Sequence, residues 1–172
     1  MKIEQNREQV SAAGFKFAVV VSRWNTDITS RLATGAAEAL SEAGAAVDSV
    51  ETFYVPGAFE LPVACLRAAQ SGRFDAVIAL GVVIRGDTPH FDYVAGCAAE
   101  GITRAAMTTG IPVLFGVITA DTLEQAIARS GEKADNKGYE AALSAVEMAV
   151  LLKEMNSRES DGSRGKGRSH VV

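Results

Sequence analysis

The sequence predicts a single-domain α/β protein, a three-layer sandwich in which a four-stranded parallel sheet is flanked by helices. The chain has 172 residues, 48% of them hydrophobic, which suits one compact domain with a sizeable core and leaves no room for a second. Short apolar runs rich in β-branched residues alternate along it with longer segments whose apolar residues recur at helical spacing. Such alternation implies right-handed βαβ crossovers, and hence a parallel sheet covered on both faces.

The first half of the chain contains two strand–helix pairs. Residues 15–21 form a short β-branched run, and apolar residues then recur at helical spacing over residues 28–43, directly before a glycine. Residues 46–54 are the second expected strand. Residues 58–70 are the second expected helix, because a Ser-Gly pair follows their apolar periodicity.

The second half repeats this order. Residues 76–84 are the third expected strand, and residues 91–109 form a helix that a glycine ends. Residues 113–118 are the fourth strand, followed by a short helix at 122–129 and a longer one at 138–155 with a clear apolar face. The predicted sheet therefore has flavodoxin-like order.

Three segments of different composition divide the chain. Residues 1–14 are polar and charged and form an N-terminal arm without an apolar signal core, so we expect a cytoplasmic protein. Residues 15–155 are the folded domain. Residues 156–172 lose all periodicity and fill with Ser, Gly, Arg and Lys, so we expect disorder there, with a weak tether for an acidic partner as the alternative.

Composition excludes several classes of function. A net charge of −4 gives no general basic surface for nucleic acid, and no run approaches the length of a membrane span. Cys65 and Cys97 lie in Ala-rich helical segments, which favours buried free thiols over a disulfide, a metal pair or a nucleophile. Phosphate loops, dinucleotide fingerprints, metal-spaced His/Cys clusters and nucleophile elbows are missing from the sequence. Acid–base chemistry with phosphate handling, without metal or cofactor, remains.

The unusual residues of the chain follow the expected strands. Ligands of open parallel sheets bind beyond the carboxyl ends of the strands, so four loops are expected to converge there. These loops are residues 22–25, 55–60, 85–90 and 119–121.

The third of these loops combines an anion site with a histidine. Thr88 is a favoured N-cap and Pro89 a favoured first helical residue, so a helix starting there directs free amides toward Gly86. Such a terminus attracts anions, and His90 in its first turn could exchange a proton beside a bound phosphate. A capped turn with a surface histidine is an equally open interpretation.

The other loops carry chemistry with structural alternatives. Trp24 could stack on a planar heterocycle or could plug the end of the sheet. Residues 58–60 offer close backbone approach and the Glu60 carboxylate, which suit a polyhydroxylated chain or else complement a helix dipole. Arg129 could supply a bidentate fork for phosphate, with charge added by Lys137 or by Lys133, although Lys133 fits an ordinary surface charge better.

Taken together, the loops and strands resemble the lumazine synthases of riboflavin biosynthesis, from about residue 15 to residue 155. The segments that carry the resemblance are residues 22–25, 28–29, 55–62, 79–94, 115–119, 124–129 and 136–138. The resemblance implies condensation of 5-amino-6-(D-ribitylamino)uracil with 3,4-dihydroxy-2-butanone 4-phosphate, giving 6,7-dimethyl-8-ribityllumazine, phosphate and water.

The resemblance also implies residue roles, with His90 as the proton donor and no cofactor or metal. The implied aminouracil site is Trp24, Ala58, Phe59, Glu60, Val82, Val83, Ile84 and Phe115. The implied phosphate site is Asp87, Thr88 and Arg129, and Asn25, Gly86, Lys137 and Glu140 match positions near the site. Two residues depart from the family's usual pattern: Trp24 replaces Phe, and Asp87 suits a phosphate only if its backbone N–H faces the ligand.

Family members assemble from pentamers, so the resemblance implies a homo-oligomer in which Phe115 and Arg129 complete the pocket of an adjacent subunit. The compact turn at residues 131–138 and an arm without proline favour a 60-subunit icosahedral shell. Riboflavin synthase is a candidate partner. A flavin-storing or regulatory homologue is the competing function, but the intact His90 and Arg129 argue against it. A receiver-like domain is set aside because Ser22-Arg23 replaces an acidic pair.

Overall fold

The computed structural model describes residues 10–164, with side chains described up to residue 157. The strands are β1 Phe17–Ser22, β2 Val50–Val55, β3 Ala76–Ile84 and β4 Val113–Ala120. The α-helices are α1 Thr26–Glu42, α2 Leu61–Gln70, α3 His90–Thr109, α4 Leu123–Ala128 and α5 Lys137–Arg164. Three short 3-10 turns are η1 Val47–Ser49, η2 Ala58–Glu60 and η3 Lys133–Asp135.

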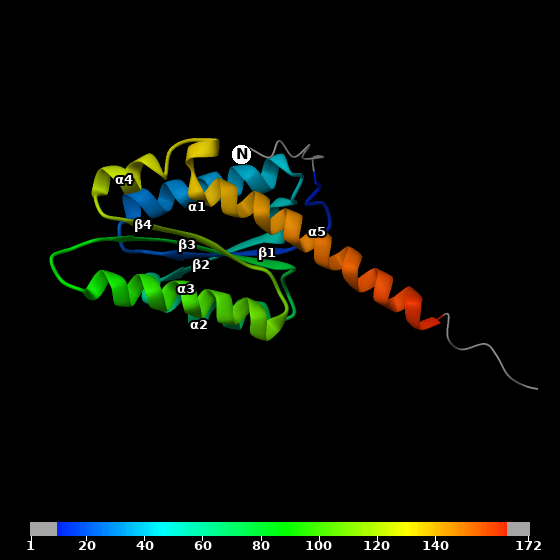
Figure 1. Cartoon of the computed structure of the whole chain (residues 1–172). Coiled ribbons are helices and arrows are strands. Elements are labelled where there is room, and N and C mark those ends of the chain that lie inside the picture. The colour runs from blue at the N-terminus through cyan, green and yellow to red at the C-terminus, as the bar shows by residue number, and fades with distance from the viewer. Residues whose placement is uncertain (1–9, 165–172) are drawn as a thin grey trace, which may run out of the picture.

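The four strands form one parallel sheet in the order β2-β1-β3-β4. Helices α1, α4 and α5 cover one face of the sheet, and α2 and α3 cover the other (Figure 1). This confirms the predicted three-layer α/β sandwich with flavodoxin-like order. Each crossover places a helix against the sheet, as parallel strands require.

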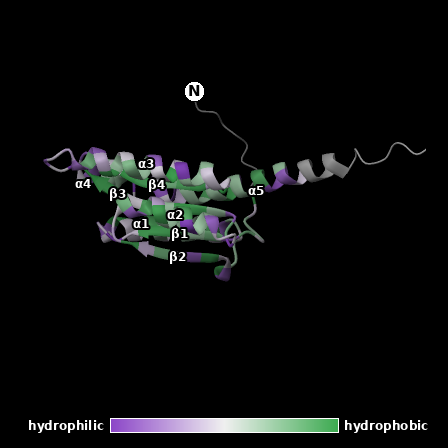
Figure 2. Ribbon diagram, turned by 90° about the horizontal axis from the view of Figure 1, so that it is seen from below, coloured by the Kyte–Doolittle hydropathy of each residue, from purple (hydrophilic) through white to green (hydrophobic). Residues whose placement is uncertain are grey.

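Strand β3 is the centre of the core. It is buried along its length except at its last residue, because β1 and β4 flank it and helices cover both its faces. Its side chains alternate between two clusters: Ile78 and Leu80 pack with α1 and α5, whereas Val77 and Ala79 pack with α2 and α3. Coloured by hydropathy, the ribbon is largely green along these inner elements (Figure 2).

Helices α1 and α5 approach each other closely enough to exclude side chains at two glycines. A Cβ at Gly138 would lie 2.0 Å from the carbonyl oxygen of Leu32, so only glycine fits at the start of α5. A Cβ at Gly35 would lie 2.6 Å from the amide of Asn136. The close crossing of the two helices therefore fixes the position at which the preceding loop ends and α5 starts.

Several element boundaries differ from the sequence prediction. Strand β2 starts at Val50 rather than at residue 46, because Ser49 donates its backbone N–H and its hydroxyl to the carbonyl of Ala46 and closes η1. Strand β4 continues to Ala120 because it pairs with β3 up to Ile84. The predicted cap at Thr88 is wrong: the N-cap of α3 is Pro89, and no side chain caps this helix.

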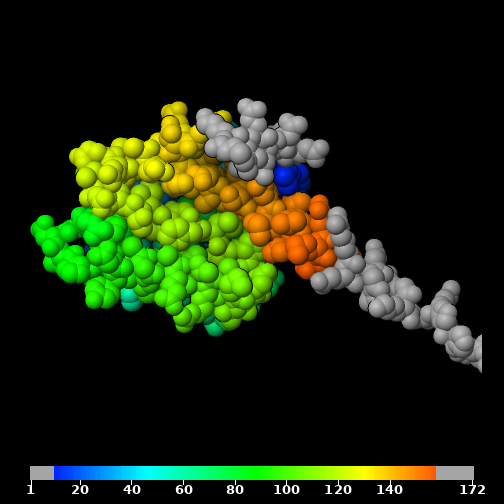
Figure 3. All heavy atoms as spheres, in the orientation of Figure 1, coloured from blue at the N-terminus to red at the C-terminus, as the bar shows by residue number. Residues whose placement is uncertain are grey.

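The two ends of the domain also depart from simple expectation. Residue Ala12 of the arm is buried and donates its backbone N–H to the carbonyl of Ala43, while residues 1–9 lie outside the described residues. Helix α5 continues through residues 156–164, where disorder is expected, and projects beyond the sheet (Figure 1). In the space-filling view, the orange part of α5 already leaves the body of the domain before the grey residues begin (Figure 3). A helix anchored in the core extends cheaply, since each added residue gains a hydrogen bond without a new nucleus. Residues 165–172 lie outside the described part. Between residues 10 and 164, no helix combines the length and the apolar character needed to cross a bilayer.

Candidate active site

The loops at the carboxyl ends of the strands are joined in pairs by backbone hydrogen bonds. After β1 and β2, Arg23 N donates to Val55 O at 2.9 Å and Trp24 N donates to Pro56 O at 3.2 Å. After β3 and β4, Arg85 N donates to Ala120 O at 2.9 Å. The loops were predicted to converge at this edge, and hydrogen bonds join the loop after β1 to the loop after β2, and the loop after β3 to the loop after β4.

Trp24 stands out from the surface in the turn after β1. Its side chain is 70% exposed, so the alternative in which it plugs the end of the sheet is wrong. Asn25 adopts a left-handed conformation, with φ 58°, and its carbonyl accepts from the backbone N–H groups of Ile28 and Thr29. Asn tolerates this conformation better than most residues. The tight turn leaves the indole face open to a planar ligand.

The segment after β2 folds into the 3-10 turn η2. Ala58 is buried, while the Phe59 side chain is 55% exposed. The Oε2 atom of Glu60 accepts from the backbone N–H of Gly57 at 2.9 Å, which supports the structural role expected as an alternative for this carboxylate. Among the described residues, none donates to its other oxygen, Oε1, which leaves that atom available to a hydroxyl group.

The end of β3 extends past its neighbour β1. Pairing with β1 stops at Leu80, whereas pairing with β4 continues to Ile84. The side chains of Val82 and Val83 are buried in the two core layers, so these residues can offer a ligand only their backbone. The β1 side of this strand end has no strand partner, so backbone N–H and C=O groups on that side are left without ladder bonds.

The turn from β3 into α3 is open to solvent. Asp87, Thr88 and His90 are all exposed, and His90 is the first residue of α3. A Cβ built at Gly86 meets no atom within 4 Å, so a ligand can approach the backbone there. Helix α3, of 20 residues, begins directly after this exposed turn, so the positive end of its dipole lies there, and no side chain caps its first N–H groups.

Arg85, at the base of this turn, has several partners that the sequence did not reveal. Its Nε donates to Asp121 Oδ1 at 2.8 Å, and its terminal nitrogens donate to Asp92 at 3.3 and 3.5 Å. The guanidinium carbon lies 4.1 Å from the centre of the Phe91 ring. The hydrogen bonds to Asp121 and Asp92 raise the pKa of Arg85 above its usual value. In the sequence, the only sign that Arg85 has a special role is its position directly after a buried strand.

A second group of predicted site residues lies along the outer edge of β4, the last strand of the sheet. A hollow of about 580 Å³ is lined by Val117, Ile118, Thr119, Ala120, Gln125, Ala128, Arg129 and Lys137. Lys137 N donates to Arg129 O at 3.0 Å, and Lys137 Nζ pairs with Glu140 at 2.7 Å. Phe115, on the same strand, is 43% exposed. No predicted site residue from the segment 24–90 lines this hollow.

Asn136 holds the loop that carries Arg129 and Lys137. Its side chain is buried and makes four hydrogen bonds: Nδ2 donates to Arg31 O and Gly131 O, and Oδ1 accepts from Gly138 N and Tyr139 N. It thereby caps α5 and joins the loop to α1. Sequence reasoning gave Asn136 no role beyond its place in a matching segment.

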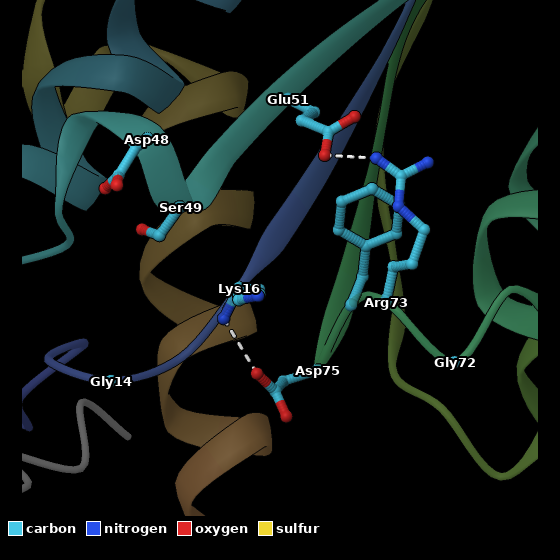
Figure 4. Close-up of a pocket in the computed structure, with 9 residues that line it drawn as sticks. Gly14, Lys16, Asp48, Ser49, Glu51, Gly72, Arg73 and Asp75 are labelled. Atoms are coloured by element: carbon cyan, nitrogen blue, oxygen red, sulfur yellow. Dashed lines mark hydrogen bonds and ion pairs between the residues drawn. The ribbon is translucent and has the colours of Figure 1, made fainter.

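A second hollow, of about 420 Å³, lies at the opposite, amino-terminal edge of the sheet (Figure 4). Here Asp75 accepts from the Lys16 backbone N–H at 2.7 Å, and Arg73 pairs with Glu51 while lying over the Phe74 ring. Its charged groups are of both signs, and Arg73 and Glu51 form an ion pair within it. It is therefore separate from the site at the carboxyl ends.

The two cysteines are free, as expected, but only Cys65 is fully buried. Burial raises the pKa of the Cys65 thiol to about 12, so it is not a nucleophile at neutral pH. Cys97 is half-buried, which corrects the expectation of two buried thiols. The described residues include no group of three His, Cys, Asp or Glu side chains arranged to hold a metal ion.

Residues 14–153 match the family described as 6,7-dimethyl-8-ribityllumazine synthase. The match covers every strand and the helices α1 to α4, together with most of α5.

Proposed function

Because the chain belongs to the 6,7-dimethyl-8-ribityllumazine synthase family of riboflavin biosynthesis, we propose that it performs the family's condensation in the cytoplasm. The substrates are 5-amino-6-(D-ribitylamino)uracil and 3,4-dihydroxy-2-butanone 4-phosphate, and the products are the lumazine, inorganic phosphate and water. The family match carries this proposal, and the geometry at the carboxyl ends of the strands supports it.

The aminouracil binds between Trp24 and the end of β3. An exposed indole offers a flat face for stacking, and the unpartnered backbone of residues 82–84 offers hydrogen-bond donors and acceptors to the polar edge of the ring. The ribityl chain lies along residues 58–60, where Oε1 of Glu60 accepts from a hydroxyl. The loop after β1, the turn after β2 and the end of β3 thus supply the stacking surface and the hydrogen-bonding groups that this substrate needs.

The butanone phosphate binds at the start of α3. Gly86, Asp87 and Thr88 lie directly before α3, with open space beside Gly86, and a helix N-terminus favours an anion. His90, the first helical residue, moves protons during imine formation, phosphate elimination and ring closure. Since the substrate amine is already nucleophilic, holding the two reactants together supplies much of the acceleration.

Arg129 and Phe115 serve the site of an adjacent copy of the chain. Phe115 lies on β4, the last strand of the sheet, and Arg129 lines a hollow beside that strand which the residues of the α3 turn do not reach; this supports a shared site in a homo-oligomer built from pentamers. Lys137 adds positive charge to that edge, and Glu140 neutralises part of it. A 60-subunit shell and association with riboflavin synthase extend the same proposal.

The test mixes the purified protein with both substrates and follows lumazine by absorbance, after subtraction of the spontaneous reaction. Saturable acceleration with phosphate release supports the synthase. We expect His90→Ala to slow turnover moderately and Arg129→Ala to raise KM for the phosphate substrate severely, because one moves protons and the other binds an anion. An unchanged KM in Arg129→Ala contradicts that role. Tight riboflavin binding without acceleration favours a storage protein instead.

A further inference from the structure

The Arg85 side chain lies between the element that carries His90 and the element that carries Arg129. On one side it contacts Asp92, two residues into α3 from His90. On the other side it contacts Asp121, which immediately precedes the N-cap of α4. Helix α4 ends at Ala128, and Arg129 is its C-cap. One guanidinium therefore joins both elements.

We propose that Arg85 is a positioning residue for the reaction, holding the start of α3 and the start of α4 in one fixed relation. This inference rests on the proposed function for its kinetic consequence. In this proposal Arg85 does not contact the substrate. It acts through Asp92 on His90 and through Asp121 on Arg129.

The orientation of the guanidinium is set from several directions. Its backbone N–H extends the β3–β4 ladder by bonding Ala120 O, and its planar group lies over the Phe91 ring at 4.1 Å. Donors of a planar group have fixed directions, so the ring contact also aims the bonds to Asp92 and Asp121. A lysine has the charge but neither the plane nor the fork, so it cannot hold both carboxylates in this way.

The contact with Asp121 is continuous with the start of α4. Asp121 N donates to Gln125 Oε1 at 2.8 Å, while Gln125 N donates to Thr122 Oγ1 at 3.3 Å. These reciprocal bonds make the first turn of α4 a unit with Asp121. Because α4 has only six residues, a shift at its start reaches Arg129 at its end.

The Arg85 side chain is 44% exposed, and exposed ion pairs add little to global stability. Its loss should therefore leave the fold intact and change the placement of the reacting groups. A displacement of about 1 Å in a catalytic group can lower the rate by as much as 100-fold, so kinetics are the sensitive readout.

The experiment compares steady-state kinetics of Asp92→Ala, Asp121→Ala, Arg85→Ala and Arg85→Lys, since alanine removes every acceptor oxygen that Arg85 uses. We expect Asp92→Ala to lower kcat by about tenfold with little change in KM, because it releases His90. Asp121→Ala should raise KM for the butanone phosphate by about tenfold with kcat nearly kept, because it releases Arg129. Arg85→Ala should show both changes, and Arg85→Lys should rescue neither.

Arg104→Ala is the matched control, since Arg104 pairs with Glu100 at 2.6 Å on the exposed face of the same helix α3. The kcat and KM of Arg104→Ala should match those of the wild type. Hydrogen exchange supplies a second readout: Arg85→Ala should speed exchange in the first turns of α3 and α4, and Arg104→Ala should not.

Wild-type kinetics in Arg85→Ala, or the same uniform loss in Asp92→Ala and Asp121→Ala, overturns the positioning role. If the wild-type protein itself gives no acceleration, the proposed function fails. The exchange data then decide whether Arg85 fixes the two helix starts: unchanged exchange in Arg85→Ala overturns that as well.

Discussion

Replacing Asn136 with alanine should destabilise the protein strongly while leaving its surface unchanged. The side chain is 3% exposed, and its four hydrogen bonds join α1, the loop before α5 and the first turn of α5. Alanine keeps none of them. The groups left behind are the N–H groups of Gly138 and Tyr139 and the carbonyls of Arg31 and Gly131.

The size of the effect follows from those four groups. Loss of an N-cap costs about 1 kcal/mol, and each backbone carbonyl left without its donor costs roughly another 1 kcal/mol where water reaches it in part. The expected loss in free energy of unfolding is therefore about 3 kcal/mol. For a domain of this length, that corresponds to a fall in Tm of roughly 6–12 °C.

A double mutant tests the reasoning more sharply than the single variant. A Cβ at Gly35 would lie 2.6 Å from the Asn136 amide, so Gly35→Ala clashes in the wild type. In the Asn136→Ala background the same methyl group fills vacated space and improves helix propensity. The double variant should therefore be more stable than Asn136→Ala.

Stability is measured by denaturant unfolding at one fixed protein concentration, since assembly would otherwise shift the apparent value. A loss below about 1 kcal/mol in Asn136→Ala, or strictly additive effects of the two substitutions, would refute the argument.

Three further outcomes are expected. Gly138→Ala places a methyl group 2.0 Å from the Leu32 carbonyl oxygen, so it should cost more than about 4 kcal/mol; a soluble variant with wild-type Tm contradicts this. Cys65, with its pKa raised to about 12 by burial, should resist alkylation near pH 8 until the protein is denatured, and peptide mass spectrometry of the native protein checks it. The hydrogen bond from Tyr139 lowers the pKa of Glu42 below 4.5, so its stabilisation is complete above that value and disappears as pH falls through the lowered folded pKa. The destabilisation of Glu42→Gln should accordingly shrink as the pH falls through the lowered pKa of Glu42, and a constant difference in unfolding free energy counts against it.

The architecture was predictable because its signals are local and repeated. The apolar run of β3 begins after Asp75 and ends before Arg85, so both boundaries of this strand match the prediction of residues 76–84. The start of β2 was missed because Ser49 bonds back to Ala46, and such local competition leaves no mark in hydrophobic periodicity. The extent of α5 was missed for the opposite reason: residues 156–164 have no apolar pattern of their own and continue a helix that begins in the core.

The candidate site was predictable only to the level of its loops. A parallel sheet places the residues after each strand at one edge, so the exposed Trp24 and the open turn before His90 were expected there. The partners of Arg85 could not be expected, because Asp92 and Asp121 are seven and 36 residues away along the chain. Asn136 is similarly a polar loop residue in sequence, and only the close crossing of α1 and α5 makes it a buried centre of hydrogen bonding.

The purely parallel sheet has a consequence for how the chain folds. Each pair of neighbouring strands is joined through a crossover, so the described sheet contains no hairpin that could form early from local sequence. Phe17 of β1 pairs with Ala76 of β3, which requires closure of a loop of roughly sixty residues before the central contact exists. Until then the edge of β3 that faces β1 has no partner within the chain and can associate with the same edge in another. Refolding should therefore be slow for a domain of this size, and its yield should fall as the protein concentration rises.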